Sequence, residues 1–433
     1  MSVVTGRMTR STILIASFLY SLLSAPSTDA VQVGGTLPGS TPWIPGESPY
    51  TVIEDILIPE DGNLVIDPGV RVLFCDDTQM IVRGRIDALG TPSRPVRLQP
   101  ERVEGRWKAV ILEQSTRGGV FRHLEVDGGS SAGSYRTGMI SIHACPASVL
   151  IEDCTFSNWP EGLGHKAIDA YASPDVTVRR CEFLEGPNEA VFGIYSPIVI
   201  ENCVFHHRRG YSDAIDLSMN TSPDPVPVLR NNIFLGSDDD GIDLDTCDAI
   251  VDSNLVMNCR GGSHDPIGIS GDKESQPTII NNVIINCENG IGFKNGSDIF
   301  VANNTIIDCD RGIWLHQDAT HASVINTIIW SRPGNQSIVL ESGSTIDVRY
   351  SLISNDEHYP GEETLTGNPL FKNADNGNYR LLPESPCIDR GTIENAPRHD
   401  FDGTERPQGE EIDIGAFEFI PGSSNILRWI FHK

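Results

Sequence analysis

The chain is short of basic residues, of aromatic residues and of helical apolar spacing. Lysine and arginine number 32 against 59 aspartates and glutamates, which gives a formal net charge of −27. Proteins that bind nucleic acid need basic patches, so this shortage argues against a nucleic-acid partner. Aromatic residues make up 7% of the chain, whereas it has 41 glycines and 28 prolines. That composition favours many short strands and turns over helices.

Long apolar runs are also missing, except for one near the N-terminus. "STILIASFLYSLLSA" follows Arg7 and Arg10, precedes the small residues of "STDA", and is too short to span a bilayer. This arrangement is typical of a secretory signal peptide, which we place over residues 1–30. The sequence therefore predicts an exported protein, extracellular or at the cell surface, with no membrane span.

What the sequence has is a repeat. One pattern of alternating apolar residues around a polar pair occurs eight times, as "VLIEDCTF", "VTVRRCEF", "IVIENCVF", "PVLRNNIF", "AIVDSNLV", "TIINNVII", "IFVANNTI" and "SVINTIIW". Its aligned turn positions recur every 22 to 29 residues, at Cys154, Cys181, Cys203, Asn232, Asn254, Asn282, Asn304 and Asn326. Three short strands fit 22 residues, and variable loops explain the longer repeats. We predict an all-β fold, a single-stranded right-handed parallel β-helix (solenoid).

Stacked coils bring like residues together. A buried asparagine can bond both the backbone and the asparagine of the next coil, which explains the Asn-rich turns. Three cysteines share the asparagine column, and a second cysteine column is predicted at Cys259, Cys287 and Cys309. Two interpretations stay open: ladders of free thiols, which behave as small buried hydrophobes, or at least one disulfide between adjacent coils.

Three regions follow the predicted signal peptide. Residues 31–115 are strand-rich with Gly turns and are predicted to form N-terminal capping coils, and residues 116–355 the β-helix repeats. Residues 356–418, with "NPLFKNADNGNYRLLPESPCIDRG", resemble the C-terminal tail module of exported bacterial β-helix proteins, and 419–433 form a short tail. The resemblance implies a bacterial exported protein. We expect a monomer.

A column of charges marks the candidate site. In strands such as "AIDLS" and "GIDLD" the Ile and Leu point inward and the residues between them point outward. One outward column then holds Asp169, Asp216, Asp243, Ser270, Gly292 and Trp314, and its neighbour holds Tyr171, Ser218, Asp245, Asp272, Lys294 and His316. Carboxylates on adjacent coils lie about 5 Å apart and raise each other's pKa unless a cation compensates. Ca²⁺ is the expected cation, because it takes several hard oxygen ligands.

These motifs resemble pectin-lyase-like right-handed β-helix proteins over most of the chain. Within that group, "DDGIDL" and "GIGFKNG" are similar to the calcium-dependent polysaccharide lyases of family nine. The resemblance implies that the D-D-G-x-D-L coil binds Ca²⁺ and that the Lys of the later strand, Lys294, is the catalytic base. By this motif Asp239, Asp240 and Asp243 would ligate Ca²⁺ and Asp216 would assist. Asp245, on the neighbouring outward column, is also predicted as a metal ligand.

One departure from that family is an extra coil, "PIGISGD", between the calcium motif and Lys294. It places Lys294 about 10 Å along the axis from Asp243, since coils repeat every 4.8 Å. The order of motifs also resembles a second group of exported bacterial β-helix proteins, with D-A-I-D-L, D-G-I-D-L, G-I-S and G-I-x-x-K on consecutive coils.

The favoured function is Ca²⁺-dependent cleavage of an acidic polysaccharide by β-elimination. Lys294 would be the base and Arg311 would hold substrate charge, while substrate would bind at Trp314, His316 and Asp272. A glycoside hydrolase using Asp216 with Asp243, or Asp245 with Asp272, is the second interpretation. The third is a non-catalytic surface protein that binds glycans, in which the aspartates hold a structural Ca²⁺ or form a solvated turn cluster.

Overall fold

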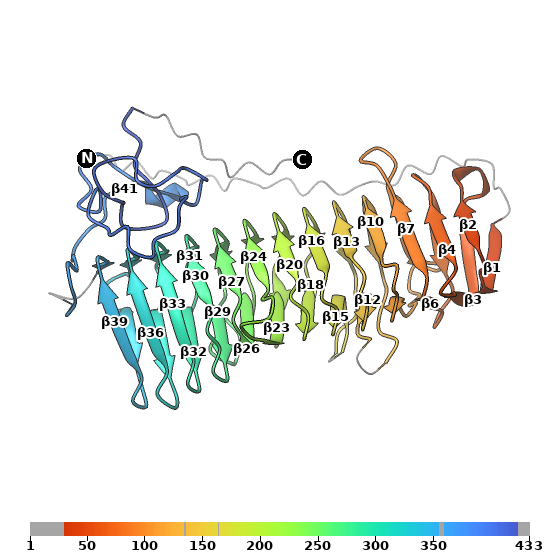
Figure 1. The fold of residues 1–433 in the computed structure, drawn as a ribbon, viewed down its shortest axis with the longest axis horizontal. Helices are drawn as coiled ribbons and strands as arrows, with labels where there is room; N and C mark the ends of the chain where they lie inside the picture. The colour runs from red at the N-terminus through yellow and green to blue at the C-terminus, as the bar shows by residue number, and fades with distance from the viewer. Residues whose placement is uncertain (1–29, 134–135, 163, 355–358, 423–433) are drawn as a thin grey trace, which may run out of the picture.

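The structure is a computed structural model that describes residues 30–133, 136–162, 164–354 and 359–422. The predicted signal peptide, up to residue 29, and residues 423–433 of the predicted short tail lie outside these ranges. The described residues form three ladders of short parallel strands that coil around a common axis (Figure 1). Apart from two short 3₁₀ helices, η1 (Pro45–Glu47) and η2 (Ala374–Asn376), they contain no helix. The predicted all-β parallel solenoid is confirmed.

The first ladder carries the candidate site on its outer surface. Its strands, each paired with the next, are β3 (Tyr50–Ile58), β6 (Met80–Val82), β9 (Val110–Glu113), β12 (Gly138–His143), β15 (Lys166–Tyr171), β19 (Val191–Ile194), β23 (Ile215–Asn220), β26 (Ile242–Cys247), β29 (Ile267–Asp272), β32 (Asn289–Lys294), β35 (Arg311–His316) and β38 (Gln336–Leu340).

The second ladder joins the first through the long strand β3, which pairs with both. It contains β1 (Val31–Thr36), β5 (Arg71–Phe74), β8 (Val96–Pro100), β11 (Leu124–Asp127), β14 (Thr155–Ser157), β17 (Glu182–Phe183), β21 (Val204–Phe205), β25 (Ile233–Phe234), β28 (Leu255–Met257), β31 (Val283–Ile285), β34 (Thr305–Ile307), β37 (Ile328–Trp330) and β40 (Leu352–Ile353).

The third ladder is a separate sheet of 13 strands, one for each coil. Its members are β2 (Ser40–Trp43), β4 (Asn63–Ile66), β7 (Arg85–Leu89), β10 (Gly119–Arg122), β13 (Val149–Glu152), β16 (Val176–Arg179), β20 (Val199–Glu201), β24 (Val228–Arg230), β27 (Ile250–Asp252), β30 (Thr278–Ile280), β33 (Asp298–Ala302), β36 (His321–Ile325) and β39 (Thr345–Arg349). All three ladders include strands from residues 31–115, the range predicted to form capping coils.

An asparagine ladder runs through the turns between the third and second ladders. Asn232 donates through both its backbone and side-chain amides to Oδ1 of Asn254, at 3.0 Å each. The same pair of bonds joins Asn254 to Asn282, and Asn282 to Asn304. Each of these side chains is fully buried, so the predicted stacking of asparagines is confirmed.

The last position of the predicted column is wrong by one residue. The backbone amide of Asn304 donates to Oγ1 of Thr327 at 3.4 Å, so Thr327 continues the ladder. Asn326 instead stacks on Asn303 and donates to the carbonyl of Thr392 in the tail. The repeat is 23 residues long at this point, and its threonine hydroxyl accepts the bond that an asparagine amide oxygen accepts elsewhere.

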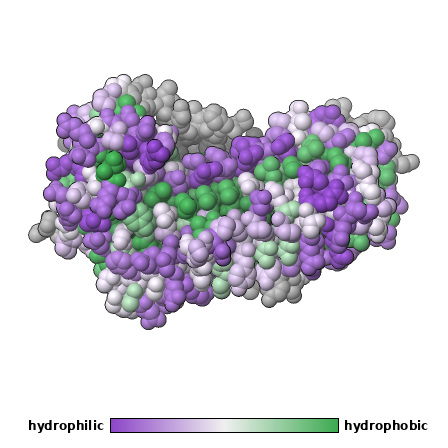
Figure 2. Space-filling view, in the orientation of Figure 1, coloured by the Kyte–Doolittle hydropathy of each residue, from purple (hydrophilic) through white to green (hydrophobic). Residues whose placement is uncertain are grey.

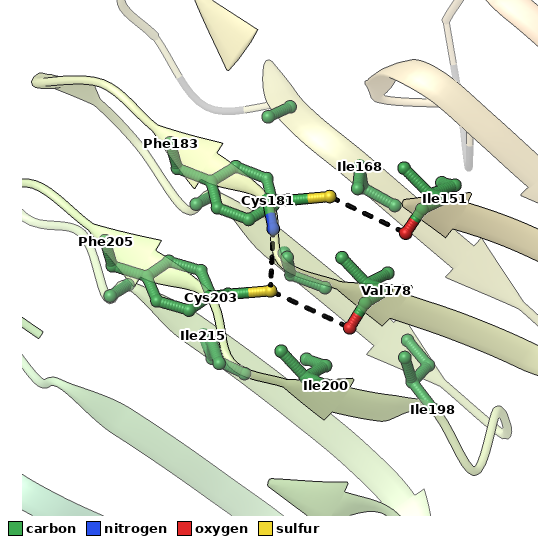
Figure 3. Packing of buried hydrophobic residues seen from close by; sticks show 14 of the residues in the cluster. Ile151, Ile168, Val178, Cys181, Phe183, Ile198, Ile200, Cys203, Phe205 and Ile215 are labelled. Carbon is green, nitrogen blue, oxygen red and sulfur yellow. Dashed lines mark hydrogen bonds between the residues drawn. The ribbon is translucent and has the colours of Figure 1, made fainter. Parts of the chain in front are cut away.

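The cysteines form ladders of free thiols, which decides between the two interpretations. All ten are free, and nine of them are buried. Figure 3 shows Cys181 and Cys203 one above the other, with the amide of Cys181 donating to Sγ of Cys203 at 3.4 Å. Beside them Phe183 and Phe205 stack with ring centroids 4.7 Å apart. The thiols therefore pack as small apolar groups.

The tail module packs against the outside of the second ladder, near the C-terminal end of the helix (Figure 1). Outward apolar residues of that ladder contact the tail, among them Val283 and Ile307, which pack with Tyr379, Ala416 and Phe417. The tail contains the antiparallel pair β41 (Phe371–Asn373) and β42 (Asn378–Leu381). A band of hydrophobic surface lies next to it in Figure 2. Among the described residues, no helix has the length and apolar character needed to cross a membrane.

Candidate functional site

A cavity of about 590 Å³ lies on the outer surface of the first ladder. It extends along seven successive coils, from the residues before β19 to the residue after β38. Its walls are formed by acidic residues at one end and by basic and aromatic residues at the other: Glu189, Tyr211, Asp213, Asp216, Asp239, Asp240, Asp243, His264, Asp265, Ile267, Ser270, Gly271, Gly292, Lys294, Trp314, His316, Gln317 and Glu341. The cavity is thus an axial groove with a strongly uneven distribution of charge.

The register of the strands confirms the predicted outward column. Asp216 pairs with Asp243, Asp243 with Ser270, and Gly292 with Trp314. Within each strand the residue after the outward aspartate, such as Leu244 after Asp243, is fully buried. The predicted alternation of inward and outward side chains therefore holds. Acidic groups distant along the chain therefore meet on one face.

Two groups of three carboxylates lie close enough to hold a cation. In each group the ligand oxygens lie within 4.8 Å of one another: Glu189, Asp213 and Asp216 form one, and Asp213, Asp239 and Asp240 form the other. Asp213 belongs to both and is the centre of the cluster. Sequence reasoning predicted neither Glu189 nor Asp213.

A signal for these two residues was present in the sequence. Both stand three positions before the outward residue of their strands, as Asp240 stands three before Asp243. The backbone confirms the alignment, because the amide of Ala190 donates to the carbonyl of Ala214, and that of Ala214 to the carbonyl of Asp240. A third acidic column, which lies in the turn directly before each strand, therefore completes the site.

Burial and mutual repulsion raise the pKa of the clustered carboxyls. Burial, with the charge of Asp243 next, raises the pKa of Asp239 to about 6. Burial and Asp245 do the same for Asp243, also to about 6. Burial and neighbouring carboxylates hold the pKa of Asp213, Asp216 and Asp240 well above the usual range. Full ionisation at neutral pH therefore requires a compensating cation.

Hydrogen bonds fix the orientation of the central carboxylates. Asp240 accepts from the backbone amide of Ile267 at 2.7 Å and from the Ser270 hydroxyl at 2.5 Å. Its own amide donates to Oδ1 of Asp213 at 3.0 Å. The Ser270 hydroxyl also lies 3.0 Å from Oδ1 of Asp243. The cluster is thus built of hard oxygen donors held in place by the next coil, a donor set that suits Ca²⁺.

Lys294 lies beyond the acidic end of the groove, two coils from Asp243, as the extra coil predicts. Its side chain is 40% exposed and its Nζ is 3.9 Å from Oδ2 of Asp272. Its positive charge offsets part of the rise in the pKa of Asp239 and of Asp243. Lys294 therefore faces the same groove as the carboxylates without a tight partner among the described residues.

Asp245 and Asp272 lie on the neighbouring column, and neither is part of the cavity wall. Asp245 accepts from Lys273 Nζ at 2.7 Å. Asp272 accepts from the backbone amide of Lys273 and from the side chain of Asn295, at 2.6 and 2.5 Å. The structure does not bring Asp245 together with the carboxylate groups that could hold a cation, although its charge raises the pKa of Asp243.

The aromatic end of the groove is already packed. The rings of Trp314 and His316 are parallel, with centroids 3.8 Å apart, and the guanidinium of Arg311 lies 4.4 Å from the centre of the Trp314 ring. Trp314 also donates to Glu341, and 8% of it is exposed. Burial and the charge of Lys294 lower the pKa of His316. The predicted sugar platform at Trp314 thus has little free ring surface.

A different aromatic residue is exposed at the groove. Tyr211, from the loop before β23, is 66% exposed and contacts the His264 ring edge-on at 4.4 Å. Both side chains stand on the wall beside the carboxylates. Sequence reasoning missed them, because loop residues have no place in the strand register.

Comparisons with known proteins agree on the architecture. A search of curated proteins found no match. Similar solved structures include the periplasmic alginate epimerase AlgG (11% identity, 68% of this chain and 77% of that chain, TM-score 0.41). Pectate lyase Pel9A (14%, 81% and 88%, 0.41) and the A-module of the Azotobacter vinelandii mannuronan C-5 epimerase AlgE6 (13%, 71% and 91%, 0.40) are others. At these identities the likeness concerns the fold. A family model described as "Right handed beta helix region" matches residues 130–264 and 226–373. These matches cover more than half of the chain, which therefore belongs to the right-handed β-helix family.

Proposed function

We propose that this protein binds Ca²⁺ at the carboxylate cluster and cleaves an acidic polysaccharide by β-elimination. The observation that carries the proposal is the convergence of six aspartates and one lysine on a single groove. The cation ligands are drawn from Glu189, Asp213, Asp216, Asp239 and Asp240. Asp243 lies beside them and shares the Ser270 hydroxyl with Asp240, but it belongs to neither group. A bound cation would neutralise the substrate carboxylate and make the adjacent proton more acidic.

Lys294 is the proposed base. In its amine form, its Nζ takes the proton on the carbon next to the sugar carboxylate. The electron pair of that C–H bond forms a carbon–carbon double bond, the glycosidic C–O bond breaks, and the departing oxygen takes a proton from solvent. Arg311 lies over the covered Trp314 ring and donates to Asn289 at 3.1 Å. It is not part of the cavity wall, so we assign it the role of supporting Trp314 and not of holding substrate charge.

The test compares Lys294→Ala with Lys273→Ala, a matched lysine that is 58% exposed and paired with Asp245. Polygalacturonate and alginate are incubated with wild type and both variants, with Ca²⁺ or with a chelator. We expect ultraviolet absorbance from unsaturated sugar products in wild type and Lys273→Ala, and a loss of at least about a hundredfold in Lys294→Ala, the scale of general base catalysis. Equal rates in the two variants would exclude Lys294 as the base.

A glycoside hydrolase is the second candidate. Asp216 and Asp243 are register partners on adjacent coils, the kind of carboxylate pair that an acid and a nucleophile require. Hydrolysis releases reducing ends without unsaturated products, so one assay separates the two reactions. Binding of the polymers without any product would indicate the third candidate, a glycan-binding surface protein.

We also propose that the protein is exported and acts on its polymer as a monomer outside the cytoplasm. The apolar run after Arg10 supports export. Fractionation of cells that express the full chain, with N-terminal sequencing of the mature protein, tests this. Recovery of uncleaved chain in the cytoplasm would contradict it.

A further inference from the structure

The outer surface of the first ladder carries a second feature on the N-terminal side of the carboxylate cluster. His143 ends β12, Tyr171 ends β15, and Tyr195 follows β19. The register aligns His143 with Tyr171, and Tyr171 with Ile194. These three side chains, which we call the aromatic ladder, therefore stand on consecutive coils of the surface that forms the floor of the groove.

The rings of the aromatic ladder contact one another. His143 and Tyr171 are stacked, with centroids 5.0 Å apart and planes at 15°. Tyr171 and Tyr195 meet edge-on at 6.1 Å and 84°. Tyr195 is 54% exposed, and Met219, which follows Ser218 on the next coil, is 42% exposed. Tyr195 and Met219 thus present apolar surface to solvent, unlike the Trp314 ring at the opposite end of the groove.

The strip is continuous with the groove. Phe192 points outward from β19 and is the register partner of Asp216, which lines the cavity. Lys166 Nζ lies 4.8 Å from the centre of the Phe192 ring and 2.7 Å from Glu189, another cavity residue. In Figure 1, β12 and β15 lie in line with β23 along the same edge of the helix.

Charge in this region is balanced, in contrast to the cluster. Lys166, at the opposite end of β15 from Tyr171, pairs with Glu189. Glu113, the register partner of His143, pairs with Arg83 and Arg136. An anionic polymer is therefore not repelled here, and the apolar contacts on offer are the Tyr195 ring and the Met219 side chain. Rings of this kind stack on the apolar faces of pyranose sugars, while hydroxyl groups at the ring edges remain in water.

We propose that the aromatic ladder is a distal sugar-binding site that holds the polysaccharide chain one to three coils from Asp216, on the side of the cluster opposite Lys294. The proposal rests on the proposed function, because it assigns the ladder to the same polymer. It predicts that affinity depends on the length of the oligosaccharide, which binding at the carboxylate cluster alone does not predict. A long oligosaccharide reaches both sites, whereas a trisaccharide bound between Asp243 and Lys294 does not reach Tyr171, which lies three coils beyond Asp243.

The experiment measures binding of octagalacturonate and trigalacturonate, and of the matching mannuronate oligosaccharides, by calorimetry in Ca²⁺. The Tyr171→Ala/Tyr195→Ala variant should bind the octasaccharide about tenfold more weakly, since each lost ring contact is worth about 0.5–1.5 kcal/mol. The trisaccharide affinity should change less than about twofold. Tyr171→Phe/Tyr195→Phe keeps the rings and should retain octasaccharide binding. Ile393→Ala, which removes a 66% exposed apolar side chain from the tail, is the control.

Each remaining outcome has a distinct meaning. Unchanged octasaccharide binding, or an equal loss for both lengths, overturns the aromatic ladder and leaves the proposed function standing. Failure of wild type to bind either length overturns both proposals. The single variant Tyr195→Ala removes a side chain that is more than half exposed, and an unchanged melting temperature in this variant shows that any loss of binding is not a loss of fold.

Discussion

Two columns of polar residues are made by the same stacking of coils and have opposite properties. Inside the helix, Asn232, Asn254, Asn282 and Asn304 each donate to and accept from a neighbour, and all are fully buried. Outside, the groove aspartates only accept, and the pKa of Asp213 is held well above its usual range, first by burial and then by the charge of Asp240. A column of identical side chains can satisfy its own hydrogen bonds when each side chain is both a donor and an acceptor. For a carboxylate, the same geometry requires a proton or a cation.

The strongest way to break this comparison is to place a carboxylate in the interior column. Asn254→Asp removes the donor that bonds Leu229 and Asn282, and it buries a charge with no cation nearby. We expect a loss of about 4 kcal/mol or more in the free energy of unfolding at pH 7, measured from urea denaturation.

The control is Gln276→Ala, which removes an exposed amide from the next coil and should change the unfolding free energy by less than about 0.5 kcal/mol. If Asn254→Asp were equally mild, the asparagine column would be a by-product of turn geometry and not a source of stability.

The converse change supplies the cation that the outer column lacks. Ca²⁺ at a hundredfold excess over its dissociation constant should raise the unfolding free energy of wild type by about 2.7 kcal/mol. Asp213→Asn removes the carboxylate shared by both groups and should abolish the effect, whereas Asp245→Asn, which removes a carboxylate outside the cavity wall, should retain it. Differential scanning fluorimetry with and without Ca²⁺ checks this. If Ca²⁺ still stabilised Asp213→Asn, the cation would have to bind outside the carboxylate cluster.

The sequence specified the ladders because its alternation and repeat length leave few other ways to bury the apolar residues. The outward column through Asp216 and Asp243 followed from the same logic, and so did the two-coil offset of Lys294. The third acidic column was missed because Asp213 and Glu189 lie in turns before the strands, where alternation no longer says which way a side chain points.

The contacts that surround each predicted residue also could not be predicted from the sequence. Trp314 occupies an outward position as expected, yet His316 and Arg311 cover it, and such contacts depend on rotamers and not on register. Tyr211 and His264 come from loops of unrelated length that converge on the cluster. Asp245, unlike Asp243, forms an ion pair with Lys273, and the strand register alone does not predict that pair.

A carboxylate with cationic partners sharpens the contrast with the groove. Glu152, on β13, accepts from Arg122, Arg179 and Arg180. Burial alone would raise its pKa, but these bonds outweigh burial and lower the pKa from 4.5 to about 2. A lowered pKa means that Glu152 stabilises the fold above pH 4.5 and that this contribution disappears as the pH falls toward 2.

Glu152→Gln should therefore cost about 2 kcal/mol at pH 7, a value reduced because the three arginines are partly exposed. The difference from wild type should close between pH 4.5 and 2 in urea titrations. Glu125→Gln, which breaks an exposed pair with Arg97, should cost less than about 1 kcal/mol at any pH. A penalty for Glu152→Gln that is independent of pH would indicate lost packing instead of lost charge.

The smallest effect is expected in the cysteine column, which has neither the bonding of the asparagines nor the repulsion of the aspartates. Cys181 and Cys203 are 22 residues apart, and a disulfide closing such a loop would add about 3 kcal/mol. Because the structure holds both as free thiols, a reductant should leave the melting temperature unchanged, and thiol titration of the unfolded protein should find all ten groups. A fall in melting temperature with reductant, or fewer thiols, would show that adjacent coils are cross-linked. The interior would then hold a third kind of column, stabilised by covalent bonds between coils and not by packing alone.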